Sequence, residues 1–549
     1  MLNNFLVSNN WDIVSSQTIK ERQGQLFPMT DVNLSDANKN LLLRKYPEGL
    51  YLHQKLAIQE YQTGKNVCMT TGTASGKSLP FYITGIEALQ QRSKSKVMAL
   101  YPLKALGSEQ EQRWNMALND AGLDARVGRI DGSVAIRKRP EILKNSDIII
   151  ATPDILHAWM LPNISNKNVY SFISNLSLVI ADEIHTYTGV FGSNAAFLFR
   201  RLEHCCNLLG GDYQYLAASA TIAQPANHLQ KLFGRDFCII NSEKDTSPSY
   251  PLQVNLIQPP GEKDLLTEVS QLMGAIAKHS DKRFITFVNS RKQTELLSSI
   301  MFRDMNKVNT DDEQINFSYD YLDYLDVLPY RAGYEEVDRK RIQERFSNGK
   351  LKGIVSTSAL ELGIDIQGLE IEILVGVPFS LTSLYQRMGR VGRSSPGEVY
   401  IINTGSVYDE AIFRKPEELF ERPLSDTALY LENQRIQYIH TMCLAREGGE
   451  HDQVCNIKNL NQSDSQIETS IIWPPGFLEL VKKEKTGEIP IELQSMKAQG
   501  AEVPHYVFPL RDVEPQFKVE YKVGPEQRNM GSLSFGQLMR EAYPGAIYY

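Results

Sequence analysis

Short apolar runs separated by longer helical stretches fill the chain between residues 66 and 218. Each run holds four to six mostly apolar residues, and most of the intervening stretches have ten or more residues in a helical pattern. This alternation is typical of a parallel sheet that helices cover on both faces. The predicted strands are residues 66–69, 96–101, 147–151, 176–181 and 213–218.

A second alternation of the same kind follows, with predicted strands at residues 283–288, 353–356, 372–377 and 398–403. Between the two, residues 241–263 contain four prolines and are interpreted as a linker. Beyond about residue 405 the alternation weakens into helical segments and mixed short strands. We therefore predict an α/β protein with two parallel-sheet lobes, residues 41–245 and 246–405. A polar N-terminal extension, residues 1–40, and an accessory mixed α+β region, residues 406–549, flank these lobes.

The composition narrows the class of protein. The net charge of −7 disfavours a protein that binds nucleic acid through its overall charge, although a local basic groove remains compatible with it. The N-terminus lacks a signal-peptide pattern, and no stretch approaches the roughly 18 apolar residues of a membrane span. The six cysteines form no CxxC pair, which favours buried thiols in a reducing compartment over a metal site. We expect a soluble cytoplasmic protein without a membrane partner.

The sequence VCMTTGTASGKS, residues 67–78, changes this picture, because a predicted strand ends there in a turn of small residues that precedes a helix. Backbone N–H groups of such a turn, together with the helix N-terminus, cradle phosphates. Lys77 would reach the β- and γ-phosphates of ATP, and the Ser78 hydroxyl would bind magnesium. The alternative is a chance turn, since Thr71 stands where the strict pattern has glycine. The remaining cradle residues are Thr73, Ala74, Ser75 and Gly76.

Gln54 lies just upstream of this loop, where its side-chain amide would read the edge of an adenine. A single glutamine at the start of a helix is more commonly solvated. Only its position relative to the loop favours the adenine-binding role.

Two carboxylates follow the predicted strand at residues 176–181. In an open α/β sheet, ligands bind at the carboxyl ends of the strands. Asp182 would hold magnesium, Glu183 would polarise the water that attacks the γ-phosphate, and His185 would couple the site to its neighbours. The alternative is an ordinary helix cap. The phosphate loop upstream favours the catalytic interpretation.

The sequence QRMGRVGR, residues 386–393, spaces three arginines with two glycines. Arg390 and Arg393 would stabilise charge on the γ-phosphoryl group, and Gln386 would orient water or contact the phosphate. The alternative is a solvated basic helix face. Asp365, in the segment LELGID, would bond the ribose.

Together these motifs resemble those of superfamily 2 helicases, in which two RecA-like lobes share one ATP. The resemblance rests on residues 53–54, 70–78, 101–106, 152–154, 182–185, 219–221, 287–291, 357–365 and 386–393. It implies contacts with the backbone of one nucleic-acid strand rather than with its bases. The residues implied are Lys104, Asp131, Gly132, Thr152, Pro153 and Asp154 in the first lobe, and Asn289, Ser290, Arg291, Arg331 and Thr357 in the second.

The segments TTGTASGKS, YPLKAL, DEIHTYTGVFGSN and YRAGY further resemble the mitomycin repair factor A group, which includes fungal helicases related to the fourth human RecQ protein. That resemblance implies a DNA helicase that uses ATP and magnesium, moves 3′ to 5′ on single strands, and serves DNA repair or anti-phage defence. The group carries a C-terminal four-cysteine module that this sequence does not reach, so we expect a fragment or a separate protein that supplies it. An RNA helicase and an ATP-binding scaffold remain alternatives.

Overall fold

The computed structural model describes the chain except residues 1, 93, 221, 307–325, 331–335, 358–359, 361–367, 425–426, 461–466, 468–469, 501–502, 513–515, 524–525 and 535–549. The chain divides into two compact units. The larger unit comprises residues 27–71, 77–244 and 426–549, and the smaller unit comprises residues 1–26, 72–76 and 245–425.

The larger unit contains a seven-stranded sheet whose paired strands are all parallel. Its order is β10-β4-β9-β8-β5-β7-β6. The five strands predicted from apolar runs are present, and the sheet also contains β6 and β10 at its two edges. The strands are β4 (Asn66–Thr70), β5 (Lys96–Leu100), β6 (Val127–Ile130), β7 (Ile148–Ala151), β8 (Leu176–Ala181), β9 (Gln214–Ala218) and β10 (Phe237–Asn241).

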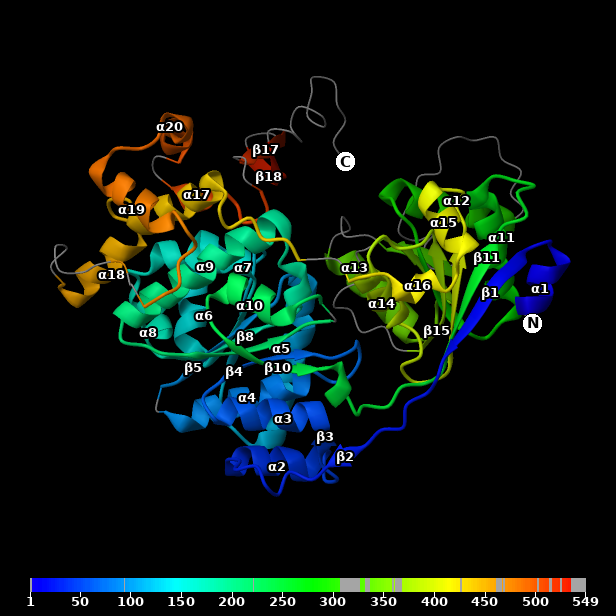
Figure 1. Cartoon of the computed structure of the whole chain (residues 1–549), viewed down its shortest axis with the longest axis horizontal. Helices are drawn as coiled ribbons and strands as arrows, with labels where there is room; N and C mark the ends of the chain where they lie inside the picture. Colours follow the sequence, from blue (N-terminus) through cyan, green and yellow to red (C-terminus); the bar gives the residue numbers. More distant parts are fainter. Residues whose placement is uncertain are drawn as a thin grey trace. The chain divides into compact units, whose positions relative to one another are not determined.

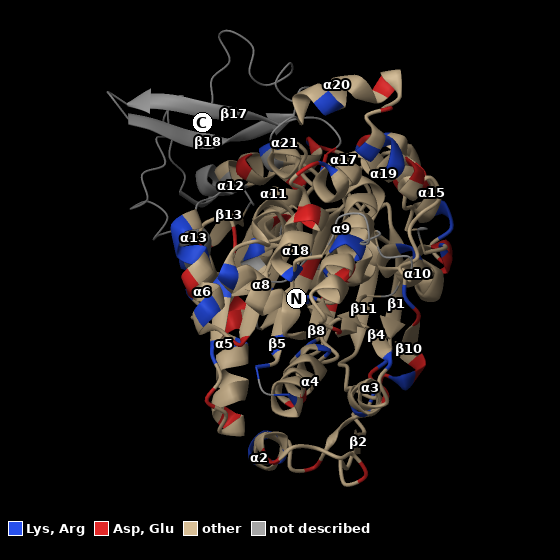
Figure 2. Cartoon of the chain, turned by 90° about the vertical axis from the view of Figure 1, so that its left-hand side faces the viewer, with Lys and Arg blue, Asp and Glu red and all other residues tan. Residues whose placement is uncertain are grey.

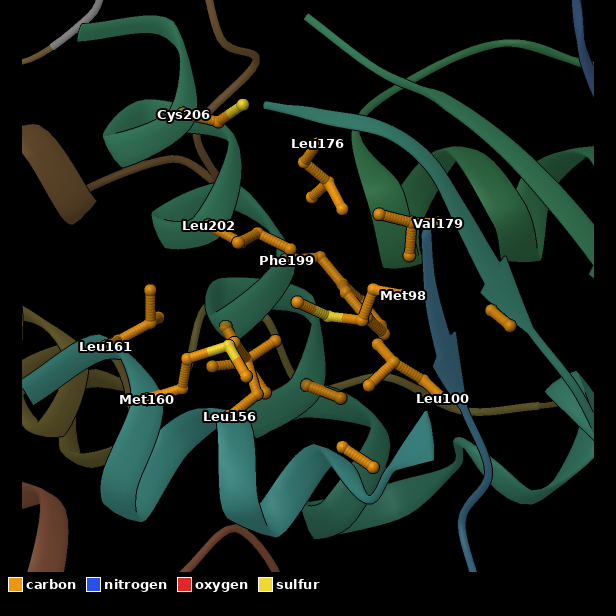
Figure 3. Packing of buried hydrophobic residues seen from close by; sticks show 14 of the residues in the cluster. Met98, Leu100, Leu156, Met160, Leu161, Leu176, Val179, Phe199, Leu202 and Cys206 are labelled. Carbon is orange, nitrogen blue, oxygen red and sulfur yellow. The ribbon is translucent and has the colours of Figure 1, made fainter. Parts of the chain in front are cut away.

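Successive residues of these strands pack against different helical layers, because side chains alternate between the faces of a sheet. Val67 and Met69 belong to a core with α3, α4 and α5, whereas Cys68 belongs to a second core with α8, α9 and α10. Figure 3 shows part of this second core, in which Met98 and Leu100 of β5 lie near Phe199 of α9. The covering helices are α2 (Asp36–Lys45), α3 (Leu52–Gln62), α4 (Ser78–Gln91), α5 (Lys104–Ala121), α6 (Arg139–Asn145), α7 (Pro153–Ile155), α8 (Lys167–Ser174), α9 (Gly189–Leu208) and α10 (Pro225–Phe233).

The smaller unit contains a second seven-stranded sheet, in the order β1-β11-β16-β15-β12-β14-β13. All its pairs are parallel except that of β1 with β11. Its strands are β1 (Asp12–Ile19), β11 (Leu252–Gln258), β12 (Arg283–Phe287), β13 (Val327–Tyr330), β14 (Gly353–Ser356), β15 (Leu369–Val375) and β16 (Gly397–Ile402). Its helices are α1 (Leu2–Ser8), α11 (Leu265–His279), α12 (Arg291–Asn306), α13 (Glu336–Ser347), α14 (Leu381–Met388), α15 (Val407–Arg414) and α16 (Glu418–Glu421).

Two stretches differ from the sequence-based interpretation. Residues 241–263, interpreted as a linker, contain β11, because the prolines at 251 and 259–260 flank the strand without interrupting it. The polar start of the chain contributes β1, which pairs antiparallel with β11 from Asp12–Gln258 to Ile19–Leu252. Its exposed, polar positions gave no apolar run to recognise.

The C-terminal part of the larger unit is mainly helical and lies against α9, as Figure 1 shows for α17. Phe197 of α9 packs with Trp473 and Phe477 in one buried cluster. The elements are α17 (Gln434–Ala445), α18 (Glu450–Lys458), α19 (Phe477–Thr486), α20 (Ile491–Gln499), α21 (Pro504–Val507), β17 (Gln516–Val523) and β18 (Glu526–Ser534). Among the described residues, none of the helices combines the length and the apolar character needed to cross a membrane.

Candidate active site

The phosphate-loop sequence forms a turn between β4, which ends at Thr70, and α4, which begins at Ser78. Ala74 and Gly76 have φ angles of 60° and 80°, and such left-handed residues turn successive backbone N–H groups toward one side. The Ser75 hydroxyl donates to the carbonyl oxygen of Gly72 over 3.0 Å. Lys77 Nζ donates to the carbonyl oxygen of Thr71 over 3.0 Å, so the ammonium group lies across the turn. This turn and its lysine fit the phosphates of a nucleotide.

Asp182 and Glu183 follow β8 in the larger unit. The Asp182 side chain accepts the Glu183 backbone N–H over 2.9 Å. Burial, and then the neighbouring Glu183 carboxylate, raise the pKa of Asp182 to about 7, while the charge of Lys77 opposes this shift. The buried Asp182 carboxylate and the hydroxyl of Ser78, the first residue of α4, are oxygen donors of the kind that magnesium prefers, so these donor types fit that ion.

Glu183 has a left-handed backbone, with φ 53° and ψ 48°, which costs a non-glycine residue free energy. Its carboxylate lies 3.4 Å from His185 Nδ1. His185 in turn contacts the end of β9: its backbone N–H donates to the Ser219 hydroxyl over 3.1 Å, and the Ala220 N–H donates to its Nδ1 over 3.3 Å. The DEIH segment is therefore bonded to the first two residues of the SAT segment, whose third residue, Thr221, lies outside the described residues.

Gln54 is buried in the first turn of α3, with 3% of its surface exposed. Its Oε1 accepts the backbone N–H of Tyr51 over 3.1 Å. This contact fixes the amide at the helix N-terminus, and the solvated alternative is wrong for this residue. Whether the amide reads adenine remains a prediction.

In the smaller unit, QRMGRVGR spans the last turn of α14 and the loop after it. Gln386 and Arg390 are buried, with 6% and 7% exposure, so this segment is not a solvated basic face. Gly392 has φ 72°, and Arg393 Nε donates to the carbonyl oxygen of Gly389 over 2.8 Å. This bond holds the Arg393 side chain against the loop. Asp365 lies outside the described residues.

The predicted strand-contact residues of the larger unit follow three neighbouring strands, β5, β7 and β6. Lys104 begins α5, and its Nζ would lie 2.6 Å from a Cβ added at Gly132, so the lysine packs against that glycine. Asp131 accepts the Ser133 backbone N–H over 2.8 Å and binds Arg129 over 2.6 Å. Burial raises the pKa of Asp131, but the bonds from Ser133 and the charge of Arg129 outweigh it and lower the pKa. The Asp131 carboxylate therefore holds its own turn in place.

Thr152 precedes α7 as its N-cap residue, and Pro153 and Asp154 form its first turn. The Asp154 carboxylate binds Arg511, from the C-terminal part of the unit, at 3.1 Å. Sequence reasoning missed Arg511, because a single arginine without a spacing pattern gave no signal. It also missed the exposed Arg137 and Lys138 after the Asp131 turn, which add positive charge beside α6 (Figure 2).

In the smaller unit, Asn289 and Ser290 follow β12, and Thr357 follows the neighbouring β14. Asn289 Nδ2 donates to the carbonyl oxygen of Val375 over 3.4 Å, and the Ser290 hydroxyl accepts the Gln293 N–H over 3.2 Å. These three residues therefore share one edge of the sheet. Arg331 and the side chain of Arg291 are not among the parts of the chain that the structure describes.

Comparison with known proteins matches the two α/β regions to two families. The DEAD/DEAH box helicase family matches residues 51–229, and the helicase conserved C-terminal domain matches residues 265–395. Among solved structures, DUF1998 helicase MrfA bound to DNA and AMPPNP superimposes with a TM-score of 0.77 and 25% identity, over 98% of this chain and 72% of that chain.

Curated relatives give the same result. The ATP-dependent helicase hrq1 of Schizosaccharomyces pombe is 33% identical over 417 residues, which are 73% of this chain and 38% of that protein. The helicase YprA of Bacillus subtilis is 30% identical over 450 residues, 80% of this chain and 57% of that protein. The chain thus spans about two fifths to three fifths of these relatives' lengths. With both helicase regions matched, the family resemblance is confirmed, and the chain belongs to the superfamily 2 helicases.

Proposed function

We propose that this chain is an ATP-dependent DNA helicase or translocase that acts in DNA repair or anti-phage defence. The observation that carries the proposal lies in the larger unit, where the charge of Lys77, the residue before α4, acts on the buried Asp182 carboxylate after β8. A similar protein, MrfA, has been crystallised with DNA and with AMPPNP. The family resemblance supports movement from 3′ to 5′ as part of this proposal.

In this proposal the nucleotide phosphates bind the backbone of residues 73–76 and the Lys77 ammonium group. Magnesium, held by Ser78 and Asp182, would neutralise charge on the phosphates. Glu183 orients the attacking water, and its left-handed backbone keeps the carboxylate close to His185. Gln54 and Asp365 contact the adenine and ribose, and Gln386, Arg390 and Arg393 complete the charge stabilisation.

The DNA strand would follow the loops after β5, β7 and β6 and those after β12 and β14. Residues in these loops present an ammonium group, hydroxyls and backbone groups. Such groups bind phosphates and do not distinguish the bases. An RNA helicase would use the same groups, so the choice of DNA rests on the similarity to MrfA. A separate protein partner and a cytoplasmic location remain predictions.

The test is ATP hydrolysis by the purified chain without nucleic acid and with single-stranded DNA, duplex DNA or single-stranded RNA. We expect stimulation by single-stranded DNA, with loss of hydrolysis in Lys77→Ala and in Glu183→Gln. Glu183→Gln should still bind a fluorescent ATP analogue, because that carboxylate acts on water. Stimulation by single-stranded RNA alone would show that RNA, and not DNA, is the substrate. If the wild-type chain binds ATP but does not hydrolyse it under any of these conditions, the result would favour an ATP-binding scaffold.

A further inference from the structure

Arg511 lies four residues after α21 and reaches back to the α/β part of the larger unit. Its Nη2 donates to the carbonyl oxygen of Pro102 over 2.7 Å and to Asp154 Oδ2 over 3.1 Å, and its Nε donates to Asp154 Oδ1 over 3.3 Å. Pro102 belongs to the loop after β5, and Asp154 follows β7. One guanidinium group therefore joins two loops that are predicted to contact the nucleic-acid strand.

The contact uses features that only arginine has. The planar fork engages both carboxylate oxygens of Asp154, and the guanidinium carbon lies 4.2 Å from the ring centroid of Phe191. Phe191 belongs to α9, which follows the DEIH segment, and its ring stacks on Tyr187 at 5.0 Å. Arg511 thus contacts α9 as well as the two loops.

The backbone before Arg511 is fixed. Leu510 is buried in the core, and its carbonyl oxygen accepts Asn194 Nδ2 over 3.1 Å. The carbonyl oxygen of Phe508 lies 2.9 Å from His157 Nε2. These two anchors come from α9 and from the helical turn after α7. They therefore fix the backbone before Arg511 to the α/β part of the unit.

The charge of Asp154 gives this contact a consequence for binding. A carboxylate in a phosphate-binding loop repels the strand, and a bonded guanidinium neutralises that repulsion. The Arg511 side chain keeps 44% exposure, so part of its positive charge faces solvent beside the loops.

We propose that Arg511 is a positioning residue for the nucleic-acid strand: it holds the loops at residues 102–106 and 152–154 in their binding arrangement and neutralises Asp154. The C-terminal part of the chain thereby sets how strongly nucleic acid stimulates ATP hydrolysis. The expected effect on ATP hydrolysis rests on the proposed function. The expected effect on the two loops rests on the bonds of Arg511 described above.

The kinetic test compares wild type, Arg511→Ala and Arg511→Lys in ATP hydrolysis at increasing concentrations of single-stranded DNA. We expect the half-saturating DNA concentration to rise about tenfold in both variants, within the usual range of coupling between sites, and the rate at saturating DNA to stay within about twofold of wild type. Arg446→Ala is the control, because the bonds of the Arg446 side chain to described residues lie within the C-terminal part, to the carbonyl oxygens of Lys497 and Gly500 and to Glu484. An unchanged half-saturating concentration in Arg511→Ala would overturn the inference, as would an equal rise in Arg446→Ala.

Hydrogen exchange of the chain without nucleic acid separates this inference from the proposed function. Arg511→Ala should speed exchange of the backbone amides in residues 101–106 and 152–156, and Arg446→Ala should leave them as in wild type. Absence of DNA stimulation in wild type would contradict the proposed function alone. Unchanged exchange in Arg511→Ala would contradict the positioning role, whatever the kinetics show.

Discussion

Arg201 and Glu450 form an ion pair that is wholly buried within the larger unit. Both side chains have 0% exposure, and Arg201 Nε donates to Glu450 Oε2 over 2.8 Å. The pair joins α9 of the α/β part to α18 of the C-terminal part, and His505 Nε2 adds a bond of 2.8 Å to the other carboxylate oxygen. The two parts are therefore joined by charges that are satisfied only when both are folded together.

Arg201→Met should destabilise the larger unit by about 3–5 kcal/mol, because it leaves the Glu450 charge buried without its partner. The double variant Arg201→Met with Glu450→Leu should recover much of that loss. Urea unfolding followed by tryptophan fluorescence measures this, since Trp114, Trp159 and Trp473 all lie in the larger unit. The control is Lys483→Ala, which removes an exposed pair and should cost less than about 1 kcal/mol. Equal losses of unfolding free energy in Arg201→Met and Lys483→Ala would contradict this prediction.

Three histidines around this pair contribute to the stability of the larger unit in a pH-dependent way, and their summed contribution is predicted to be greatest near pH 6.5. Burial lowers the pKa of His505, but Cys443 and Glu450 outweigh it and raise the pKa to about 9. A raised pKa stabilises the fold below pH 6.5, and this stability is lost as the pH rises toward 9. Burial, with the charge of Arg201, lowers the pKa of His157 and of His440 well below 6.5, so their contribution is lost as the pH falls below 6.5.

Urea unfolding between pH 5 and 9 measures this dependence. His505→Gln should flatten the alkaline side of the profile, by up to about 3 kcal/mol at pH 9, and leave the acid side in place. An alkaline side that is unchanged in the variant would show that another group titrates there.

Two helical glycines should respond to alanine in opposite directions. A Cβ at Gly85 in α4 would lie 2.4 Å from the buried Trp114 ring, whereas a Cβ at Gly274 in α11 would meet nothing within 4 Å. Gly85→Ala should therefore destabilise by roughly 1–3 kcal/mol through overpacking, and Gly274→Ala should stabilise by up to about 1 kcal/mol through helix propensity. Thermal unfolding of the two variants measures both effects. Stabilisation by Gly85→Ala would show that Trp114 moves aside freely.

Lys104→Ala should weaken binding of single-stranded DNA and reduce the slope of log affinity against log salt by about 0.7, the value for one phosphate contact on a single strand. Fluorescence anisotropy at several salt concentrations gives that slope. Lys45, an exposed lysine of α2, supplies the matched control, since it lies on a helix away from the predicted strand-contact loops. An unchanged slope in Lys104→Ala would remove Lys104 from the strand contact.

The sequence predicted those parts of the fold in which pattern and chemistry coincide. Strands buried on both faces, such as 176–181, read as apolar runs, and the phosphate loop has a fixed spacing between its small residues and Lys77. Edge strands were missed because their exposed positions are polar: β1 alternates without an apolar run, and β6 contains Gly128 and Arg129. The contact of Arg511 with Asp154 joins residues 357 positions apart, and no local pattern encodes it.

The most direct test of the proposed function is displacement of streptavidin from biotin-tagged single-stranded DNA by the purified chain with ATP and magnesium. The account predicts movement from 3′ to 5′, which displaces streptavidin from a 5′-end tag faster than from a 3′-end tag. Lys77→Ala should clear neither. Displacement of the 3′-end tag alone would reverse the direction of movement. Failure at both ends, in a chain that hydrolyses ATP when DNA is added, would contradict translocation itself.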